Sequence, residues 1–488
     1  TVFYRKSPMS RPNIVFIMAD DIGYGDIHCY NPRSRIPTPH IDRLAREGIR
    51  FTDAHSPSAV CTPTRYGVLT GRYCWRSALK NGVLYGYEPP LIERDRPTVP
   101  GLLKENGYQT ACFGKWHLGM GYTAKEGAEL GFDRPLPWGN SERAFEEQID
   151  FSAPLFGGPT DLGFDYFYGT SGCPTCQPPY GFIENERFVE EPSVYHDQPV
   201  FTSRPGMMVP GWQHKDADPQ ITSAAVRYIE DQAQSDKPFF MYLCPDAAHE
   251  PCTNEVVPDF ARGQSEAGPR GDLVWLFDWI VGQVMETLEK TGQTDNTLVV
   301  VTSDNGALPG DRTGPTSYRT YGHASSGSLR GFKSHIWEGG HREPFIARWP
   351  GRIAADTISQ ELVCLTDLMA TCASLAGAEL PEGAGEDSVD IGPALFGQKL
   401  HQPLRDHLIH HSGTGVFSLR QAEWKCIFET QGSGGWPPPQ GGPPEAGTPG
   451  QLYNLFDDPA EEMNLWEIRP RVVADMQGLL DYQRTDRP

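Results

Sequence analysis

Short, almost continuously apolar runs recur along the chain, and segments with helical periodicity lie between them. Residues 13–19, 238–244 and 297–302 have the composition of strands that are buried on both faces of a sheet. Residues 220–232 and 272–289 instead space their apolar side chains at helical intervals. This alternation predicts an α/β fold with a large, mixed, mostly parallel sheet flanked by helices.

The same patterns predict further elements along the chain. Strands are expected at residues 49–54 and 108–113 and after Glu343, and helices at residues 41–47, 97–105 and 360–376. After a Gly- and acid-rich stretch, four strand-like runs and one helical run predict a small antiparallel sheet with one helix: residues 407–411, 415–419, 424–428, 451–455 and 470–483. We therefore expect a large domain over residues 1–395 and a C-terminal α+β subdomain over residues 396–488.

Residues 119–220 interrupt the regular pattern. This stretch is rich in loops and in aromatic side chains, among them Trp138, Tyr166, Tyr180 and Trp212. A long irregular insertion inside a compact domain is typical of a binding or lid region. Surface elaboration packed by its own aromatic residues explains the composition equally well.

Polar residues that could hold a cation follow two of the predicted strands. Asp20 and Asp21 come directly after the first apolar run, and Asp304 and Asn305 follow the run that ends at residue 302. Ligands bind at the carboxyl ends of strands in α/β sheets, and carboxylate and amide oxygens suit a hard cation. Each of these dipeptides, taken alone, is also a common turn sequence.

Cys61 is expected at the beginning of a helix. Pro63 has the fixed φ of a first helical turn, and Gly71 is suited to end the helix. The N-terminus of a helix is electropositive and favours an anion. A cysteine at this position indicates a catalytic role only if the neighbouring residues also fit such a role.

Two stretches identify a family. The run Cys61-Thr-Pro-Thr-Arg65, followed by Leu69-Thr-Gly-Arg72, resembles the signature of type I sulfatases, in which Cys-x-Pro-x-Arg marks the cysteine that is oxidised to formylglycine. Residues 107–119 resemble the second signature of this family, at the expected distance downstream. Residues 329–351 and 452–461 extend the likeness over nearly the whole chain, so the chain is identified as an arylsulfatase-like member of the alkaline phosphatase superfamily.

The resemblance implies a sulfuric ester hydrolase that releases inorganic sulfate, with a formylglycine formed from Cys61 and a divalent cation, calcium before magnesium. The metal ligands would be Asp20, Asp21, the modified Cys61, Asp304 and Asn305. Arg65 would orient the modified side chain, His117 would accept its proton, Lys115 and Lys333 would bind sulfate oxygens, and His249 would protonate the leaving oxygen. A formylglycine-generating or other cysteine-modifying enzyme would be a partner during maturation.

The expected substrate is a small sulfated saccharide, taken as a monosaccharide or a chain end. The aromatic residues of the 119–220 stretch could offer flat faces to a sugar ring. Four further side chains could bind its hydroxyls: His214, Lys215, Arg319 and His323. A small aryl or alkyl sulfate is the competing expectation.

Two other functions remain open at this point. Relatives with formylglycine also cleave phosphodiesters or phosphonate monoesters, so such a hydrolase could use the same residues. A catalytically silent binding protein would keep the fold but leave Cys61 unmodified.

The composition argues against two classes of binding partner and gives no direct sign of the cellular compartment. With 42 Lys and Arg against 63 Asp and Glu, the formal charge is −21, which argues against a nucleic acid or an anionic membrane surface as partner. The longest apolar runs are too short to span a membrane. No signal peptide is visible in the chain, so a periplasmic, secreted or other exported location rests on the resemblance alone.

The chain has 11 cysteines, and oxidation of Cys61 would leave an even number that permits full pairing. Cys173-Pro-Thr-Cys176 has the spacing of a metal or redox motif. A local disulfide or free thiols are expected there in preference to a zinc or redox site.

Overall fold

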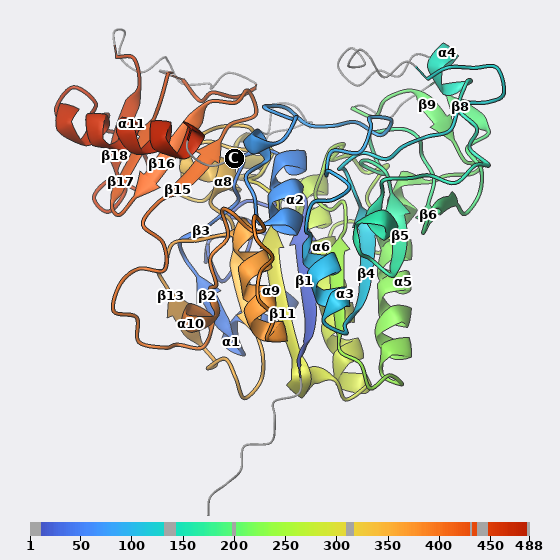
Figure 1. Cartoon of the computed structure of the whole chain (residues 1–488), viewed down its shortest axis with the longest axis horizontal. Helices are drawn as coiled ribbons and strands as arrows, with labels where there is room; N and C mark the ends of the chain where they lie inside the picture. Colours follow the sequence, from blue (N-terminus) through green and yellow to red (C-terminus); the bar gives the residue numbers. More distant parts are fainter. Residues whose placement is uncertain are drawn as a thin grey trace, which may run out of the picture.

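The computed structural model describes residues 11–130, 143–197, 202–308, 317–429, 432–436 and 448–485. Its centre is a ten-stranded sheet (Figure 1). From edge to edge the strands are β13 (Thr357–Ser359), β2 (Ile49–Phe51), β12 (Phe345–Arg348), β11 (Thr297–Ser303), β1 (Asn13–Ala19), β10 (Phe239–Cys244), β4 (Gln109–Lys115), β5 (Tyr166–Thr170), β6 (Ile183–Glu184) and β7 (Arg187–Phe188). The five strands from β11 to β5 are parallel, whereas β12, β6 and β7 are antiparallel to their neighbours, so the predicted mixed, mostly parallel sheet is confirmed.

Helices cover both faces of the sheet, which explains why its central strands are apolar throughout. In β1, Ile14, Phe16 and Met18 belong to one buried cluster, and the residues between them belong to the other. The first cluster includes side chains of α2 (Cys61–Thr70), α3 (Val99–Glu105) and α9 (Leu368–Ala376). The second includes side chains of α1 (Pro39–Arg46), α5 (Ala217–Gln232) and α6 (Gly268–Lys290). Because successive side chains of a strand point to opposite faces, every position of β1 is buried.

Most predicted elements are present within a few residues of their expected ends, with two exceptions. The predicted helix over residues 360–376 is wrong in its first half, because β14 (Val363–Cys364) pairs there with β3 (Ala54–His55) and α9 begins only at Leu368. The predicted strand over residues 49–54 ends at Phe51, and the chain pairs again only in β3. An apolar run of this length fits a short strand or a helix, and only tertiary pairing decides between them.

The stretch 119–220 contains more structure than the sequence predicted. Its strand β5 extends the large sheet, and β8 (Val194–His196) pairs with β9 (Gly206–Met208). A short helix, α4 (Arg143–Glu146), lies near this pair (Figure 1). Loops connect these pieces at the upper right of the view, beyond the carboxyl ends of the parallel strands.

The C-terminal part forms the predicted antiparallel sheet with one helix. Its strands are β15 (Leu408–His411), β16 (Phe417–Gln421), β17 (Trp424–Ile427) and β18 (Gln451–Asn454), and its helix is α11 (Pro470–Thr485). The helix α10 (Gly392–Leu395) precedes this part of the chain, and the domain boundary at residue 395 stays a prediction. Figure 1 shows this subdomain, in orange and red, beside the upper end of the large sheet. In the described part of the chain, no helix combines the length and apolarity that a membrane crossing requires.

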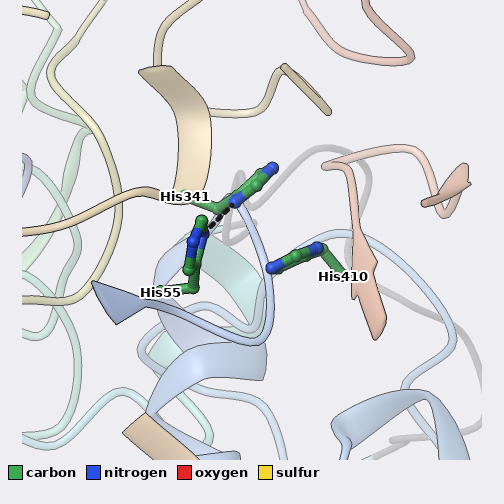
Figure 2. Close-up of side chains that lie close together, drawn as sticks. All are labelled: His55, His341 and His410. Atoms are coloured by element: carbon green, nitrogen blue, oxygen red, sulfur yellow. Dashed lines mark hydrogen bonds between the residues drawn. The ribbon is translucent and has the colours of Figure 1, made fainter. Parts of the chain in front are cut away.

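A buried histidine cluster joins the two parts (Figure 2). His55 comes from β3, His341 from α8 (Glu338–His341) and His410 from β15. The Nδ1 atoms of His55 and His341 are 3.1 Å apart, and the His341 and His410 rings stack with centroids 3.9 Å apart. At the two ends, His55 Nε2 lies 2.9 Å from Asp53, and Lys425 Nζ lies 3.1 Å from His341 Nε2. A chain of hydrogen bonds from Lys425 to Asp53 therefore crosses the junction.

The cluster should make the fold sensitive to acid. Burial, together with Lys425, holds the pKa of His341 well below its usual range, and burial beside His341 does the same for His410. The native protein keeps these imidazoles neutral, so below about pH 6.5 the unfolded chain binds more protons and the free energy of unfolding falls.

The free energy of unfolding of the wild type should fall between pH 7.5 and pH 5. We predict that this fall is smaller in His410→Gln, by up to about 2 kcal/mol. Chemical denaturation at both pH values measures it, with His401→Gln, at an exposed position, as the control. If the free energy of unfolding fell equally in both variants between these pH values, His410 would not have this role.

Candidate active site

Four polar residues meet at the carboxyl edge of the sheet, as the sequence predicted. Asp20 and Asp21 follow β1, Asp304 and Asn305 follow the neighbouring β11, and all four are fully buried. Asp21 has φ 58°, which turns the chain away from the strand direction immediately after Asp20. Its backbone N–H donates to Asp304 Oδ1 over 3.3 Å, and Asn305 Nδ2 donates to Asp21 Oδ1 over 2.6 Å.

Cys61 is the first residue of α2, as predicted, and Gly71 ends this helix in the left-handed conformation. The preceding Val60 is extended, so the chain changes direction at the cysteine. Cys61 Sγ lies 3.7 Å from Asp20 Oδ1 and is 1% exposed. Burial, reinforced by Asp20, raises the pKa of the thiol well above its usual value, so an unmodified Cys61 is a protonated and weakly nucleophilic group.

Arg65, one turn further along α2, connects the two acidic strand ends. Its Nη2 atom lies 2.7 Å from Asp20 Oδ2 and 2.8 Å from Asp304 Oδ2, and Nη1 donates to the Lys115 carbonyl over 3.0 Å. The guanidinium and both carboxylates are entirely buried. Arg65 therefore contacts two of the carboxylates that are expected to bind the metal.

Two lysines complete the charge cluster. Lys115, the last residue of β4, contacts Asp20 Oδ2 at 2.5 Å, and Lys333 Nζ lies 2.7 Å from Asp21 Oδ1. Backbone bonds hold the Lys333 segment, since Lys333 N donates to Ala307 and the next residue donates to Ala59 just before α2. Both lysines thus reach the site from segments that are far from Cys61 in sequence.

The donor set suits a hard divalent cation. Burial, and then Asp20 and Asp304, raise the pKa of Asp21 to about 7 against the opposing effect of Lys333. Burial also raises the pKa of Asp304. Asn305 Oδ1 is buried and has no hydrogen-bond partner among the described residues. Converging carboxylates and an unpartnered amide oxygen are the ligands that calcium and magnesium prefer.

Two histidines flank the cysteine. His117 follows β4 and His249 follows β10, and both line the same cavity as Cys61. His249 Nε2 lies 3.7 Å from Asp21 Oδ2, and His117 Nε2 lies 2.6 Å from the Leu84 carbonyl. Burial and the nearby lysines lower the pKa of both imidazoles well below the usual value. Both rings are therefore neutral at pH 7 in this structure.

A cavity of about 790 Å³ lies in front of Cys61 and is much larger than a sulfate group. Cys61 lines it from the beginning of α2, and segments that follow the strands and loops from distant parts of the chain contribute the other lining residues. The wall residues include Asn81, Tyr85, Gln177, Arg204, Thr414 and Trp436. The sequence predicted none of these six, because they lie on separate loops without a pattern that relates one to another.

Two predicted substrate contacts are corrected by the structure. His323 is 1% exposed, its Nε2 lies 2.8 Å from Asp26, and its Nδ1 accepts from the Arg35 backbone. Asp26 in turn pairs with Arg270, which donates to the Asp21 carbonyl over 2.8 Å, so His323 supports the acidic strand end from behind. Arg319 is exposed on α7 (Ser317–Tyr321) and is absent from the cavity wall.

The aromatic residues proposed as sugar platforms also have other partners. Tyr166 stacks on Tyr228, Trp212 packs on Phe182, and the buried Tyr180 donates to the Arg204 carbonyl. Trp138 lies outside the described residues. Of the two remaining candidates, His214 lies beside the Pro174 carbonyl and Lys215 pairs with Asp259.

All 11 cysteines are free thiols, so the full pairing that their number permits is not observed. Cys173 and Cys176 lie on either side of His249, with Sγ atoms 3.8 Å from Nε2 and 3.7 Å from Nδ1. One imidazole nitrogen of His249 and the two thiols lie within 4.8 Å of one another, so these three groups are close enough to hold a metal ion. Of the disulfide and free-thiol alternatives, the structure contains the free thiols.

Comparisons with known proteins agree with this geometry. The sulfatase family profile matches residues 12–378. The chain is 32% identical to N-acetylgalactosamine-6-O-sulfatase of Bacteroides thetaiotaomicron, over 97% of this chain and 93% of that protein. It is 33% identical to human arylsulfatase A, over 93% of this chain and 83% of that protein.

Solved structures show the same architecture. A Bacteroides thetaiotaomicron sulfatase, solved in work on the metabolism of multiple glycosaminoglycans, superimposes with a TM-score of 0.81 at 29% identity, covering 98% of this chain and all of that one. A sulfatase from Pseudoalteromonas sp. superimposes with a TM-score of 0.72 at 24% identity, covering 98% of this chain and 92% of the other. The chain therefore belongs to the sulfatase family and is a sulfuric ester hydrolase.

Proposed function

We propose that the protein removes sulfate from a small sulfated saccharide, with a formylglycine made from Cys61 as nucleophile and a divalent cation beside it. One observation carries this proposal: Cys61 begins α2 within 3.7 Å of Asp20 and lines a cavity that is also lined by Lys333, His117 and His249. An anionic ester would there meet fixed cations and a helix N-terminus in a buried setting.

The proposed cation is calcium, with magnesium as the second choice, because the available ligands are oxygens. Asp20, Asp21, Asp304, Asn305 and the modified side chain at position 61 would hold it. When bound, it would lower the pKa of a nearby hydroxyl and polarise a sulfate oxygen. Arg65 stabilises this arrangement because its Nη2 atom contacts Asp20 and Asp304 together.

The hydrated aldehyde of formylglycine supplies two hydroxyls on one carbon, of which one attacks sulfur and the other later expels sulfate. His117 has a buried Nδ1 without a partner among the described residues and is neutral, as a proton acceptor must be. His249 would give a proton to the leaving oxygen, and the arriving anion favours the protonated imidazole that this step needs. Lys115 and Lys333 would neutralise the sulfate oxygens.

The saccharide part of the proposal rests on two observations. The similar Bacteroides protein is named for a sulfated sugar. The cavity also offers hydroxyl and amide groups, from Asn81, Gln177 and Thr414, in positions where sugar hydroxyls could bind them. An exported location and a cysteine-modifying partner follow from the same proposal.

The first prediction concerns Cys61. Active protein should carry an aldehyde at position 61, and Cys61→Ala should be inactive with a correctly folded chain. Peptide mass spectrometry together with sulfate release from nitrophenyl sulfate measures both, and Cys112→Ala, a buried cysteine of β4, is the control. Full activity in protein whose Cys61 is entirely thiol would contradict the proposed nucleophile, and hydrolysis confined to phosphodiesters would favour the alternative activity.

The second prediction concerns the cation. Asp304→Asn should weaken calcium binding by at least roughly 100-fold, because loss of a direct ligand should exceed the 10- to 100-fold cost of losing an outer-shell group. Titration calorimetry measures the affinity, with the surface carboxylate variant Asp259→Asn as the control. Wild-type affinity in Asp304→Asn would show that the ligand assignment is wrong.

The third prediction separates acid catalysis from binding. His249→Ala should slow a sugar sulfate by roughly 10²- to 10⁴-fold, whereas a nitrophenyl sulfate, whose leaving group needs little protonation, should lose less than about tenfold. The ratio of the two kcat/KM values is the measurement, and His401→Ala is the control at an exposed position. Equal losses on both esters would remove His249 from the role of general acid.

A further inference from the structure

Arg204 is a half-buried cation in the cavity wall that takes no part in the sulfate-binding cluster. Its Nη1 donates to the Cys176 carbonyl over 3.2 Å, and its guanidinium lies over the Tyr85 ring with 4.9 Å to the centroid. Within the described residues it forms no ion pair with a carboxylate. The bond to Cys176 and the contact with Tyr85 hold the guanidinium plane in one orientation.

The guanidinium has five N–H donors in a planar fork, and one of them is used by the Cys176 carbonyl. The donors on Nε and Nη2 have no hydrogen-bond partner among the described residues, although the side chain lines the cavity. Such a fork matches the two oxygens of a carboxylate or a sulfate. Ordering a partly buried cation at this place without a protein acid is costly unless a ligand provides the counter-charge.

The acidic residues of the same wall do not replace that ligand. The Glu88 carboxylate accepts the Tyr85 backbone N–H over 2.5 Å and is thereby held at the Tyr85 loop. Glu250 also lines the cavity and contributes to raising the pKa of Arg204, but the two form no ion pair in the described part of the chain. The guanidinium can therefore still bind an anion that enters the cavity.

The position of Arg204 relates it to the reacting centre. Its Nη1 lies 3.9 Å from Cys176 Sγ, and the same sulfur lies 3.7 Å from His249 Nδ1. Only one thiol thus separates the guanidinium from the imidazole proposed to face the leaving oxygen. A group bound by Arg204 would belong to the same sugar as the cleaved ester or to its direct neighbour.

We infer that Arg204 forms a second anion subsite, which selects saccharides that carry a sulfate or a carboxylate in addition to the ester that is cleaved. This inference rests on the proposed saccharide function and adds a specificity determinant to it. Tyr85 keeps the fork flat and pre-oriented, so the second anion is bound with little loss of side-chain freedom. Since the cleaved sulfate is held by Lys115, Lys333 and the cation, Arg204 is dispensable for a substrate with one charge.

The test compares Arg204→Met, which removes the charge, with Arg204→Lys, which keeps the charge without the fork. The substrates are nitrophenyl sulfate, N-acetylgalactosamine 6-sulfate, its 4,6-disulfate and a 6-sulfated disaccharide that contains a uronate. Wild type should prefer one of the last two. Arg204→Met should lower kcat/KM for the preferred one by roughly 10- to 100-fold, mainly through KM, and leave the singly charged esters within about threefold. Arg204→Lys should be intermediate, and Lys290→Met, at an exposed position of α6, controls for net charge.

A parallel binding experiment keeps this inference separate from the catalytic proposal. In Cys61→Ala protein, where no ester is turned over, calorimetry should show tighter binding of the doubly charged sugar than of the singly charged one, and Arg204→Met should remove the difference. Equal losses for all four substrates, or no preference for a second anion in either experiment, would overturn the inference. Absence of hydrolysis with the binding difference intact would instead refute the catalytic proposal and leave the subsite standing.

Discussion

The bridge that Arg65 makes between Asp20 and Asp304 is the interaction on which the rest of the site depends. Two carboxylates at adjacent strand ends would repel each other in a buried setting, and each would tend to take up a proton. The guanidinium contacts both carboxylates through Nη2 and cannot itself lose its charge. Because Arg65 and Cys61 lie one turn apart on α2, the same contact also fixes the cysteine over the acidic edge.

The charge balance in this region is arranged in layers. Lys115 and the cavity-lining Lys333 contact the acids directly, while Arg270 and His323 reach the same strand end through Asp26. Arg270, His323 and Asp26 form the outer layer, which touches no reacting atom but holds the acidic strand end in position. Removing a member of such a network leaves its partner charged and buried, which costs more than the pair itself contributes.

Much of this site could be predicted from the sequence because its residues are tied to elements with strong local signals. Asp20 follows an apolar strand, and Cys61 lies two residues before a proline that favours the first turn of a helix. The positions of both residues therefore follow from backbone rules. The signatures then relate segments that no local pattern connects, such as those of Lys115 and Lys333. His323 was misassigned because the sequence does not show whether an imidazole faces a cavity or an inner carboxylate.

The regions that sequence reasoning missed share one cause. Arg204 lies on a loop of the 119–220 stretch, and its partners Tyr85 and Cys176 come from other loops, so only the folded chain brings them together. The same cause explains the error in residues 360–376, where pairing of β14 with β3 overrides a pattern compatible with a helix. Contacts between distant irregular segments have no periodicity to detect.

The cavity wall also receives residues from the C-terminal subdomain. Thr414 and Trp436 lie beyond residue 378, where the match to the sulfatase family ends, yet they face the same space as Cys61. The bridge between Ser58 and His411 ties this subdomain to the segment that leads into α2. Part of the surface that would contact the proposed saccharide thus lies outside the segment that matches the family. A comparison confined to residues 12–378 can identify the reaction type of a family member, but it leaves out residues that line the cavity in front of Cys61.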